Sequence, residues 1–540
     1  MTDCDVIVLG CGAAGMTAAL AAHEAGARVE IIERFDRIGG TAAVSGGVIW
    51  VPDNPRMRAA GISDSRTEAL AYFKALAHDD LRDEVLEAFV DNGSDALAFL
   101  EDLGALKVEL LSGYPDYYLD RPGAKPEGGR ALDHDLYSLD HLGEWAERIF
   151  DIEYPKPMML RETPLGGGTG IVAPQELQRR MGANERGFGQ AMVARLLKAC
   201  LDRGIEPHLG LETHRLIQEE GRIVGIEATK DAKSFSLRAS QGVIIATGGF
   251  EWDTELRRTF LRGPADTPAS PPTARGDGLT LAMIAGARLG NMTSAWWAPT
   301  LASPNNKWAG GEQRAEPLLI ERTVPHSLMV NRSGKRFCNE AANYSALAGA
   351  FHAFDPQSYD YVNQPAWLVF DAQYRARYPI TTIMPGDPLP NWIAEASSLA
   401  ALADMIGVDG DALESTVEQF NGFVRQGHDP DFARGTSAYD HFYGDRSREG
   451  AAVTLGTVEQ GPFYAVEVGM GMLGTNGGPQ TDGAARILGH DGKPIPGLYG
   501  AGNAIACPTG GIYAGAGGTL GPALTFGYLA GRSAARVDNS

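Results

Sequence analysis

Three glycines near the amino end of the chain are spaced so that they could hold the phosphates of a dinucleotide. They are Gly10, Gly12 and Gly15, and Glu33 follows the last of them by 18 residues. Gly10 permits a tight turn, Gly12 lets the backbone approach a pyrophosphate, and Gly15 lets a helix pack closely on a strand. An acidic side chain at the distance of Glu33 can accept hydrogen bonds from a ribose diol. These residue types and their spacing predict a bound dinucleotide.

A strand, a helix and a second strand must position these residues. The apolar residues 5–9 predict a buried strand, the alanine-rich residues 16–25 a helix, and residues 29–32 a second strand. A helix that begins beside the glycines offers free N–H groups and the positive end of its dipole to the phosphates. This order of elements is the βαβ unit of dinucleotide-binding proteins.

Three further glycine-containing stretches occur at 39–47, 243–250 and 497–503. Together with the first motif, and in this order, they resemble the elements of two-dinucleotide-type flavoproteins, in which the second loop lies along the pyrophosphate and the ribityl chain. The resemblance implies that the dinucleotide is FAD. The residues expected to contact it are Gly10, Gly12, Ala13, Ala14, Gly15, Glu33, Arg34, Gly39, Gly40, Thr41, Ala42, Ser45, Gly46, Gly47, Ala246, Thr247, Gly248, Gly502, Asn503, Gly518 and Leu520.

Composition narrows the classes of partner. The net charge is −21 and no basic stretch is interleaved with aromatic residues, so nucleic acid is not expected to bind. The five cysteines are scattered and form no CxxC pair, which predicts neither a metal site nor a disulfide framework and favours a reducing compartment. No signal-peptide pattern precedes residue 5, and no apolar stretch approaches the roughly 20 residues that span a membrane. We expect a cytoplasmic protein, and a peripheral membrane contact stays open.

The flavin-related stretches occupy the two ends of the chain, and the middle is a different kind of sequence. We therefore expect an α/β fold with a Rossmann-like FAD-binding domain that is split between residues 1–290 and 466–540. Residues 291–465 are expected to form an inserted α+β catalytic or cap domain.

Two stretches carry a more specific resemblance. They are 331–344, which ends in Asn343-Tyr344, and 513–522, which runs from Tyr513 through a glycine-rich loop. With the flavin elements they resemble the fumarate reductase and succinate dehydrogenase flavoprotein superfamily and, within it, the 3-ketosteroid dehydrogenases. The resemblance covers essentially the whole chain.

This resemblance implies a dehydrogenation beside a ketone. The ketone oxygen needs hydrogen-bond donors, because charge develops on it when the neighbouring carbon loses a proton. By resemblance, those donors are the Tyr513 hydroxyl and the Gly517 N–H, and Tyr344 as tyrosinate takes the proton. Tyr117 is expected to assist proton relay, although the adjacent Tyr118 is an alternative because only one of the pair would face the site. Hydride would pass to flavin N5.

Departures from the wider superfamily restrict the substrate. Residues 511–521 contain no His, Arg or Lys, so a dicarboxylate such as fumarate would be poorly neutralised there. Gly40 stands before Thr41, where the respiratory enzymes carry the histidine that binds flavin covalently, so we expect noncovalent FAD. Arg332, Lys335 and Arg336 are expected to form a solvated turn.

Several substrates and directions stay open. The leading hypothesis is 1,2-desaturation of a 3-ketosteroid, with an electron acceptor that the sequence does not identify. Other small apolar cyclic ketones, such as a 4-oxocyclohexanecarboxylate-like compound, or the 4(5α) bond of a ketosteroid, would need the same groups. A flavin ene-reductase running in the opposite direction is a further alternative, whereas a flavin-binding protein without catalysis is disfavoured by the three motif tyrosines.

Overall fold

The computed structural model describes residues 4–77, 81–151 and 157–536, and the chain forms two compact units. Unit 1 consists of Met1–Leu261, Ser270–Ala295 and Gly474–Ser540, and unit 2 consists of Arg262–Ala269 and Trp296–Leu473. The expected insertion at 291–465 accounts for most of unit 2, which also takes in the short stretch Arg262–Ala269. Across the described residues, no helix combines the length and the apolar character needed to cross a bilayer.

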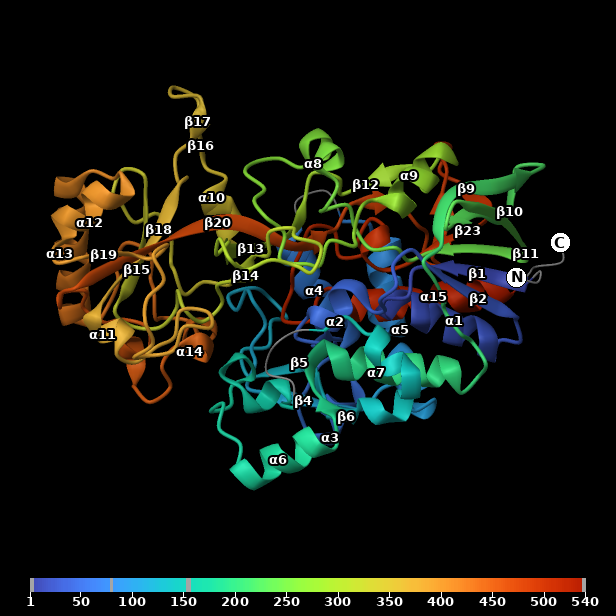
Figure 1. The fold of residues 1–540 in the computed structure, drawn as a ribbon, viewed down its shortest axis with the longest axis horizontal. Coiled ribbons are helices and arrows are strands. Elements are labelled where there is room, and N and C mark those ends of the chain that lie inside the picture. The colour runs from blue at the N-terminus through green and yellow to red at the C-terminus, as the bar shows by residue number, and fades with distance from the viewer. Residues whose placement is uncertain (1–3, 78–80, 152–156, 537–540) are drawn as a thin grey trace. The chain divides into compact units, whose positions relative to one another are not determined.

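Unit 1 is built on a sheet with the strand order β22-β23-β11-β1-β2-β8 (Figure 1). The strands are β1 (Cys4–Leu9), β2 (Val29–Glu33), β8 (His208–Leu209), β11 (Lys233–Ile245), β22 (Arg486–Leu488) and β23 (Pro494–Gly500). All neighbours run parallel except β22, which is antiparallel to β23. Val6, Val8 and Ile244 have no exposed surface, as is typical of a parallel sheet covered on both faces. The strands predicted at 5–9 and 29–32 are β1 and β2. Beyond the sheet, β11 continues into an antiparallel meander with β10 (Arg222–Lys230) and β9 (Glu212–Glu219).

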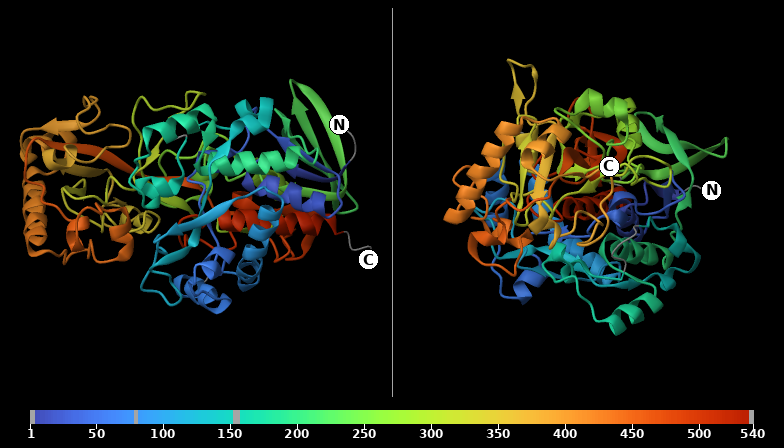
Figure 2. Two further views of the ribbon diagram at one scale, coloured as in Figure 1. Left: turned by 90° about the horizontal axis from the view of Figure 1, so that it is seen from below. Right: turned by 60° about the vertical axis from the view of Figure 1, so that its left-hand side comes forward.

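Helices α1 (Ala13–Glu24) and α15 (Leu520–Ala535) pack against each other and against this sheet, so that the red ribbon of α15 lies beside the blue ribbon of α1 (Figures 1 and 2). The packing requires glycine on α15. A Cβ atom on Gly527 would lie 2.6 Å from the Ala14 carbonyl oxygen, and one on Gly531 would lie 2.2 Å from that of Ala18. Any side chain at these positions would push the helices apart. The first and last parts of the chain are thereby joined in one core.

A second, antiparallel sheet of unit 1 has the order β3-β5-β4, with β3 (Ile49–Trp50), β4 (Val108–Ser112) and β5 (Gly128–His134). Helices α4 (Arg66–Leu76) and α5 (Asp83–Asp102) supply Phe73 and Phe89, which pack on the Trp50 ring at centroid distances of 5.5 and 6.4 Å. This aromatic core holds β3 in place.

Unit 2 contains a sheet of order β14-β13-β20-β18-β15, with β19 paired to β20. Its strands are β13 (Ala295–Leu301), β14 (Glu316–Pro317), β15 (Ser327–Asn331), β18 (Ala366–Asp371), β19 (Ala394–Ala396) and β20 (Phe463–Thr475). Helices α12 (Leu399–Ile406) and α13 (Gly410–Gln426) pack on it and share a core in which Leu402, Leu413 and Phe420 meet Leu328 and Val369 (Figure 1).

The expectation of a solvated turn at 332–336 is wrong for Arg336. Its side chain is 4% exposed and binds Glu340 at 2.8 Å and Asp429 at 2.9 Å. Arg434, also buried, lies 3.2 Å from the same Glu340. Although burial acts in the opposite direction, the two guanidinium groups hold the pKa of Glu340 at about 2. Buried charges of this kind persist because they are paired, and the cluster fixes the stretch that leads to Tyr344.

One buried carboxylate of unit 1 binds a residue close to each of the two points where the chain returns from unit 2. Glu251 is 1% exposed and accepts a hydrogen bond from the Ser270 hydroxyl at 2.9 Å and from the Thr475 N–H at 3.3 Å. Ser270 and Gly474 are the first residues of unit 1 after those returns. Burial raises the pKa of Glu251 from its ordinary 4.5 to about 7, although these hydrogen bonds act against it.

The raised pKa predicts a pH-dependent stability that Glu251→Gln removes. An acid whose folded-state pKa is raised stabilises the fold fully below its unfolded pKa, and that stability is lost as pH rises through the folded value. The free energy of unfolding of the wild type, measured against that of Glu251→Gln by urea denaturation, should therefore fall by about 3 kcal/mol between pH 4.5 and 7. The exposed Glu255→Gln serves as control and should follow the wild type. Parallel curves for the wild type and Glu251→Gln would contradict this prediction.

Candidate active site

The predicted cofactor loops of unit 1 meet at one edge of the parallel sheet. Leu9 pairs with Ile245 between β1 and β11, and Ile245 pairs with Gly500 between β11 and β23. Backbone hydrogen bonds continue just past the strand ends, from Ala246 N–H to Leu9 O at 2.8 Å and from Ala501 N–H to Ile245 O at 3.0 Å. Ligands of open α/β sheets bind outside the carboxyl ends of the strands. The loops at 10–15, 246–248 and 501–503 lie at that edge.

The three fingerprint glycines differ in what requires them. A Cβ atom on Gly10, whose φ is 103°, would lie 2.4 Å from Ala246 O, and one on Gly15 would lie 2.0 Å from Gly10 O. Both positions are therefore closed by the protein itself. A Cβ atom on Gly12 would approach no protein atom closer than 3.9 Å. The protein leaves room beside Gly12, and this space fits the pyrophosphate of a dinucleotide.

Helix α1 begins at Ala13 and not at the predicted Met16, because Gly12 is its N-cap with an extended backbone. No side chain caps the first turn, so the N–H groups of Ala13, Ala14 and Gly15 have no partner inside the helix. These donors and the positive end of the helix dipole face outward at Gly12, which is the arrangement that binds phosphate.

Glu33 stands at the end of β2 with both carboxylate oxygens held. The Cys11 N–H donates to Oε2 at 2.9 Å and the Phe35 N–H to Oε1 at 3.0 Å. Burial raises the pKa of Glu33, and these N–H groups act against it. The carboxylate thus joins the end of β2 to the glycine turn and keeps further lone pairs for a ribose.

Arg34, also expected to contact the cofactor, is engaged in ion pairs with Asp277 at 2.7 Å and Glu212 at 3.0 Å. Sequence reasoning missed Asp277, which opens α9 (Asp277–Ile284). The Gly276-Asp277-Gly278 stretch was the available signal. The Gly278 N–H donates to the Thr247 hydroxyl at 3.2 Å, so this stretch holds both Arg34 and the loop after β11.

The second glycine loop is tied to the first by a hydrogen bond from Gly39 N–H to Cys11 O at 3.0 Å. It forms the short helix α2 (Gly40–Val44), which contains Thr41 and Ala42. The Ser45 hydroxyl then accepts the Gly47 N–H at 3.1 Å. A Cβ atom on Gly46 would make ordinary van der Waals contacts with Leu160 at 3.8 Å and Val48 at 3.9 Å, so the surrounding protein does not by itself require glycine there.

At the carboxyl end of the chain, Gly502 lies against the first turn of α1, where its Cβ atom would be 3.0 Å from that of Ala14. Asn503 follows in a short 3-10 turn. Gly518 precedes the N-cap Thr519 of α15, and Leu520 is its first residue. The sixteen-residue helix α15 therefore presents a second N-terminus in unit 1, of the kind that stabilises negative charge.

Two of the predicted catalytic tyrosines meet in unit 1. The rings of Tyr117 and Tyr513 stack with centroids 5.4 Å apart and an interplanar angle of 8°, and both residues are 4% exposed. The Tyr117 N–H donates to Ala514 O at 3.0 Å. The segment around Tyr117 is an irregular loop and not a strand, and within it the Tyr117 ring stacks on Tyr513.

Gly517 has its own structural requirement. Its φ is 90°, and a Cβ atom would lie 2.5 Å from Val48 O and 2.7 Å from Trp50 N. Its carbonyl accepts the Trp50 N–H at 3.1 Å. Within the described part of the chain, the Gly517 N–H donates to no protein acceptor. The close approach to β3 explains the glycine, and its N–H is available to a ligand.

Tyr344 belongs to unit 2 and is 5% exposed. The buried Arg322 holds the backbone that leads to it, because its guanidinium donates to Ala342 O at 2.7 Å and also to Glu340 O. The Asn343 side chain accepts the Ala346 N–H at 2.9 Å on the other side. Hydrogen bonds therefore hold the backbone on both sides of Tyr344 within its unit.

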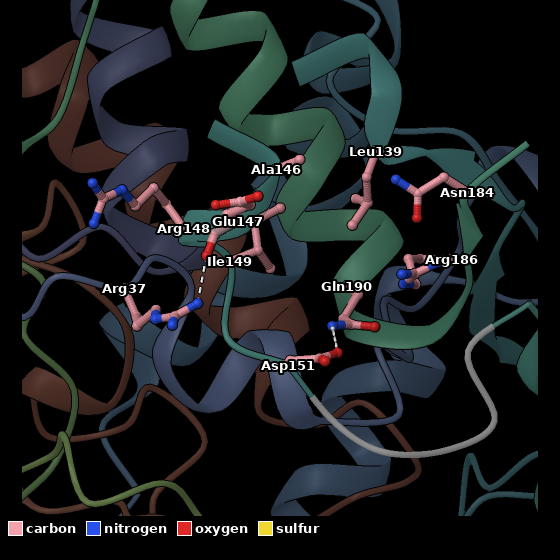
Figure 3. A pocket seen from close by; sticks show the side chains of 10 residues that line it. All are labelled: Arg37, Leu139, Ala146, Glu147, Arg148, Ile149, Asp151, Asn184, Arg186 and Gln190. Atoms are coloured by element: carbon pink, nitrogen blue, oxygen red, sulfur yellow. Dashed lines mark hydrogen bonds between the residues drawn. The ribbon is translucent and has the colours of Figure 1, made fainter. Parts of the chain in front are cut away.

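A cleft of about 520 Å³ opens elsewhere on unit 1, beside the start of α7 (Phe188–Leu201) (Figure 3). Its charged lining mixes Arg37, Arg148 and Arg186 with Glu147 and Asp151. None of the residues expected to contact the cofactor or the ketone lines it.

Comparison with known proteins identifies the family of the chain. Residues 5–520 match the family model described as FAD binding domain. The chain is 40% identical to the 4-oxocyclohexanecarboxylate 2-dehydrogenase of Sinomonas cyclohexanicum over 98% of its length and 92% of the relative's. It is 36% identical to the 3-oxosteroid 1-dehydrogenase of Mycolicibacterium smegmatis over 97% of its length and 96% of the relative's.

Among solved structures, it resembles the 3-ketosteroid delta1-dehydrogenase of Sterolibacterium denitrificans, determined in complex with 1,4-androstadiene-3,17-dione. The TM-score is 0.92 and the identity 33%, over 99% of this chain and all of the other. The predicted α/β FAD-binding fold is confirmed. The chain therefore belongs to the FAD binding domain family, together with the 3-oxosteroid 1-dehydrogenases.

Proposed function

We propose that this protein is an FAD-dependent dehydrogenase that introduces a double bond next to a ketone, with 1,2-desaturation of a 3-ketosteroid as its first candidate reaction. The observation that carries the proposal is the buried Tyr117–Tyr513 stack, joined through the backbone to Gly517. The 36% identity to a 3-oxosteroid 1-dehydrogenase and the likeness to a ketosteroid dehydrogenase structure support it.

In this proposal FAD is bound without a covalent link. The N–H groups at the start of α1 and the space beside Gly12 receive the pyrophosphate, and Glu33 receives the ribose. The residue before Thr41 is Gly40, which offers no side chain for a flavin bond. When bound, FAD supplies the acceptor for a hydride.

In this proposal, residues of the protein polarise the ketone and transfer the proton. The Tyr513 hydroxyl and the Gly517 N–H donate to the ketone oxygen and stabilise the charge that develops there. The α-carbon loses its hydrogen as a proton to the Tyr344 phenolate, and the β-carbon loses its hydrogen with the electron pair. Tyr117 relays the proton. The role of Tyr344, which lies in the other unit, rests on the sequence resemblance.

A second candidate substrate is a 4-oxocyclohexanecarboxylate-like ketone. It is favoured by the 40% identity to a dehydrogenase of that name. The same donors and the same base would serve, because the reacting bond again lies next to a carbonyl.

Anaerobic bleaching distinguishes the substrates. We expect the 450 nm flavin band of the purified protein to disappear with a 3-ketosteroid, with stoichiometric enone formation. A faster reaction with 4-oxocyclohexanecarboxylate would favour the second candidate. No bleaching with either ketone, together with rapid reoxidation of the reduced flavin by an enone, would overturn the proposal in favour of an ene-reductase.

Gly12→Ala should weaken FAD binding without unfolding the protein. Its Cβ atom would meet no protein atom within 3.9 Å but would occupy the space assigned to the pyrophosphate. We expect the Kd for FAD to rise at least about tenfold, since one lost charged hydrogen bond is worth about 1.5 kcal/mol or more. The urea midpoint of the apoprotein should stay unchanged. Gly182→Ala, which also has open space around its Cβ atom, is the control and should retain FAD. Unaltered FAD affinity in Gly12→Ala would refute the placement of the pyrophosphate.

Tyr513→Phe should lower kcat about 10²- to 10³-fold while FAD stays bound, because one donor to the developing oxyanion is lost. Tyr344→Phe should abolish measurable proton abstraction, seen as loss of solvent exchange at the α-carbon. Tyr499→Phe, a partly buried tyrosine of β23, is the matched control and should turn over normally. Normal turnover in Tyr344→Phe would eliminate it as the base.

A further inference from the structure

A buried ion cluster of unit 1 lies directly behind the stacked tyrosines. Arg130 is 1% exposed and binds Asp64 through two parallel hydrogen bonds of 2.8 and 2.7 Å. Its remaining arm donates to Asp116 at 2.8 Å, and Asp116 is 2% exposed. Asp116 immediately precedes Tyr117 in the chain.

The Asp116 carboxylate accepts hydrogen bonds from three separate segments of the chain. Besides Arg130, the Trp50 indole N–H donates to Oδ1 at 2.9 Å and the Lys125 backbone N–H to Oδ2 at 2.9 Å. The Arg130 guanidinium also lies 5.3 Å from the Trp50 ring and 5.6 Å from the Tyr72 ring. One carboxylate therefore fixes β3, the Tyr117 loop and β5 to one another.

Trp50, Tyr72 and Tyr117 form hydrogen bonds to the backbone of residues 513–517. The backbone N–H of Trp50 donates to Gly517 O at 3.1 Å, and the backbone N–H of Tyr117 donates to Ala514 O at 3.0 Å. The Tyr72 hydroxyl donates to that same Ala514 oxygen at 2.8 Å and accepts the Tyr118 N–H at 3.1 Å. The fit is tight, since a Cβ atom on Gly515 would lie 2.5 Å from Trp50 Nε1.

We propose that Asp116 and Arg130 are positioning residues, which act through Trp50 and Tyr117 to hold Tyr513 and Gly517 at the spacing needed to polarise one carbonyl oxygen. This inference rests on the proposed function and adds to it two buried residues that are not among those expected to contact the ketone or the flavin. Burying an ion pair contributes little net stability compared with apolar packing. Its value here is geometric, because a displacement of about 1 Å at reacting groups costs roughly 10²-fold in rate.

The test uses Asp116→Asn in the FAD-loaded full-length protein. Asparagine keeps the size of the side chain and the acceptor for Trp50, but it places an NH2 donor where Oδ2 accepts from both Arg130 and the Lys125 N–H. We expect bound FAD, a 10- to 100-fold lower kcat and a KM changed by less than threefold. The isotope effect on kcat from deuterium at the α-carbon should rise, because carbonyl polarisation limits proton removal. Amide exchange in peptides covering 512–519 should become faster.

Asp133→Asn is the matched control, since Asp133 of β5 is also a buried carboxylate and is paired with an arginine, Arg161, at 3.2 Å. It should keep kcat per FAD-loaded molecule within twofold of the wild type. Arg130→Lys is the second variant, and it should lower kcat less than Arg130→Met because it retains one charged donor to Asp116.

The outcomes separate the hypotheses. Unchanged exchange at 512–519 in Asp116→Asn, or an equal loss of kcat in Asp133→Asn, overturns the positioning role. A wild-type protein that oxidises no ketone overturns the proposed function and the catalytic part of this inference. In that case, faster exchange in Asp116→Asn would mean that Asp116 stabilises the 513–517 segment without a role in catalysis.

Discussion

The parallel pairing of β1, β2, β11 and β23 is the constraint on which the predicted site depends. Parallel strands place their carboxyl ends at one edge, so residues 10–15, 246–248 and 501–503 meet there although they are separated by hundreds of positions in the chain. Helix α1 starts at this edge with Gly12 as its N-cap. Because glycine has no side chain, the space in front of the first turn of the helix stays free of protein atoms at this position. The split of unit 1 in sequence follows from the same pairing, since β23 and α15 complete a sheet and a core begun by β1 and α1.

Beside this edge, the tyrosine pair is held by a different kind of interaction. Tyr117 and Tyr513 are brought together by backbone hydrogen bonds between irregular segments, which carry little intrinsic preference for one conformation. Such segments need additional fixed partners to hold one geometry. The Asp116–Arg130 cluster and the Trp50 core supply them, so that a loop without regular secondary structure acquires the rigidity of the sheet next to it.

The sequence predicted those parts of the structure that local periodicity and glycine spacing determine. β1, β2 and α1 appear where expected, and α1 begins three residues early only because Gly12 already caps it. What it could not predict depends on contacts between distant residues. Arg336 looked like part of a solvated turn, but Glu340 and Asp429 bury it. Glu251 and Asp116 carried no local signal of their partners, and nothing in the Tyr117-Tyr118 pair shows which ring stacks on Tyr513.

The glycines show how a ligand site can be recognised in a chain without its ligand. The sequence contains 68 of them, and most of those at this site, such as Gly10, Gly15 and Gly517, are required by backbone that passes too close for a Cβ atom. For these positions the protein alone is a sufficient cause, and they say nothing about a cofactor. Gly12 is different, because the protein atom nearest to the Cβ position there lies 3.9 Å away. Gly12 lies at the edge where helix α1 begins with N–H groups that have no partner inside the helix. The strongest physical argument for a bound dinucleotide is therefore the space beside Gly12 at the start of α1, and not the number of glycines in the motif.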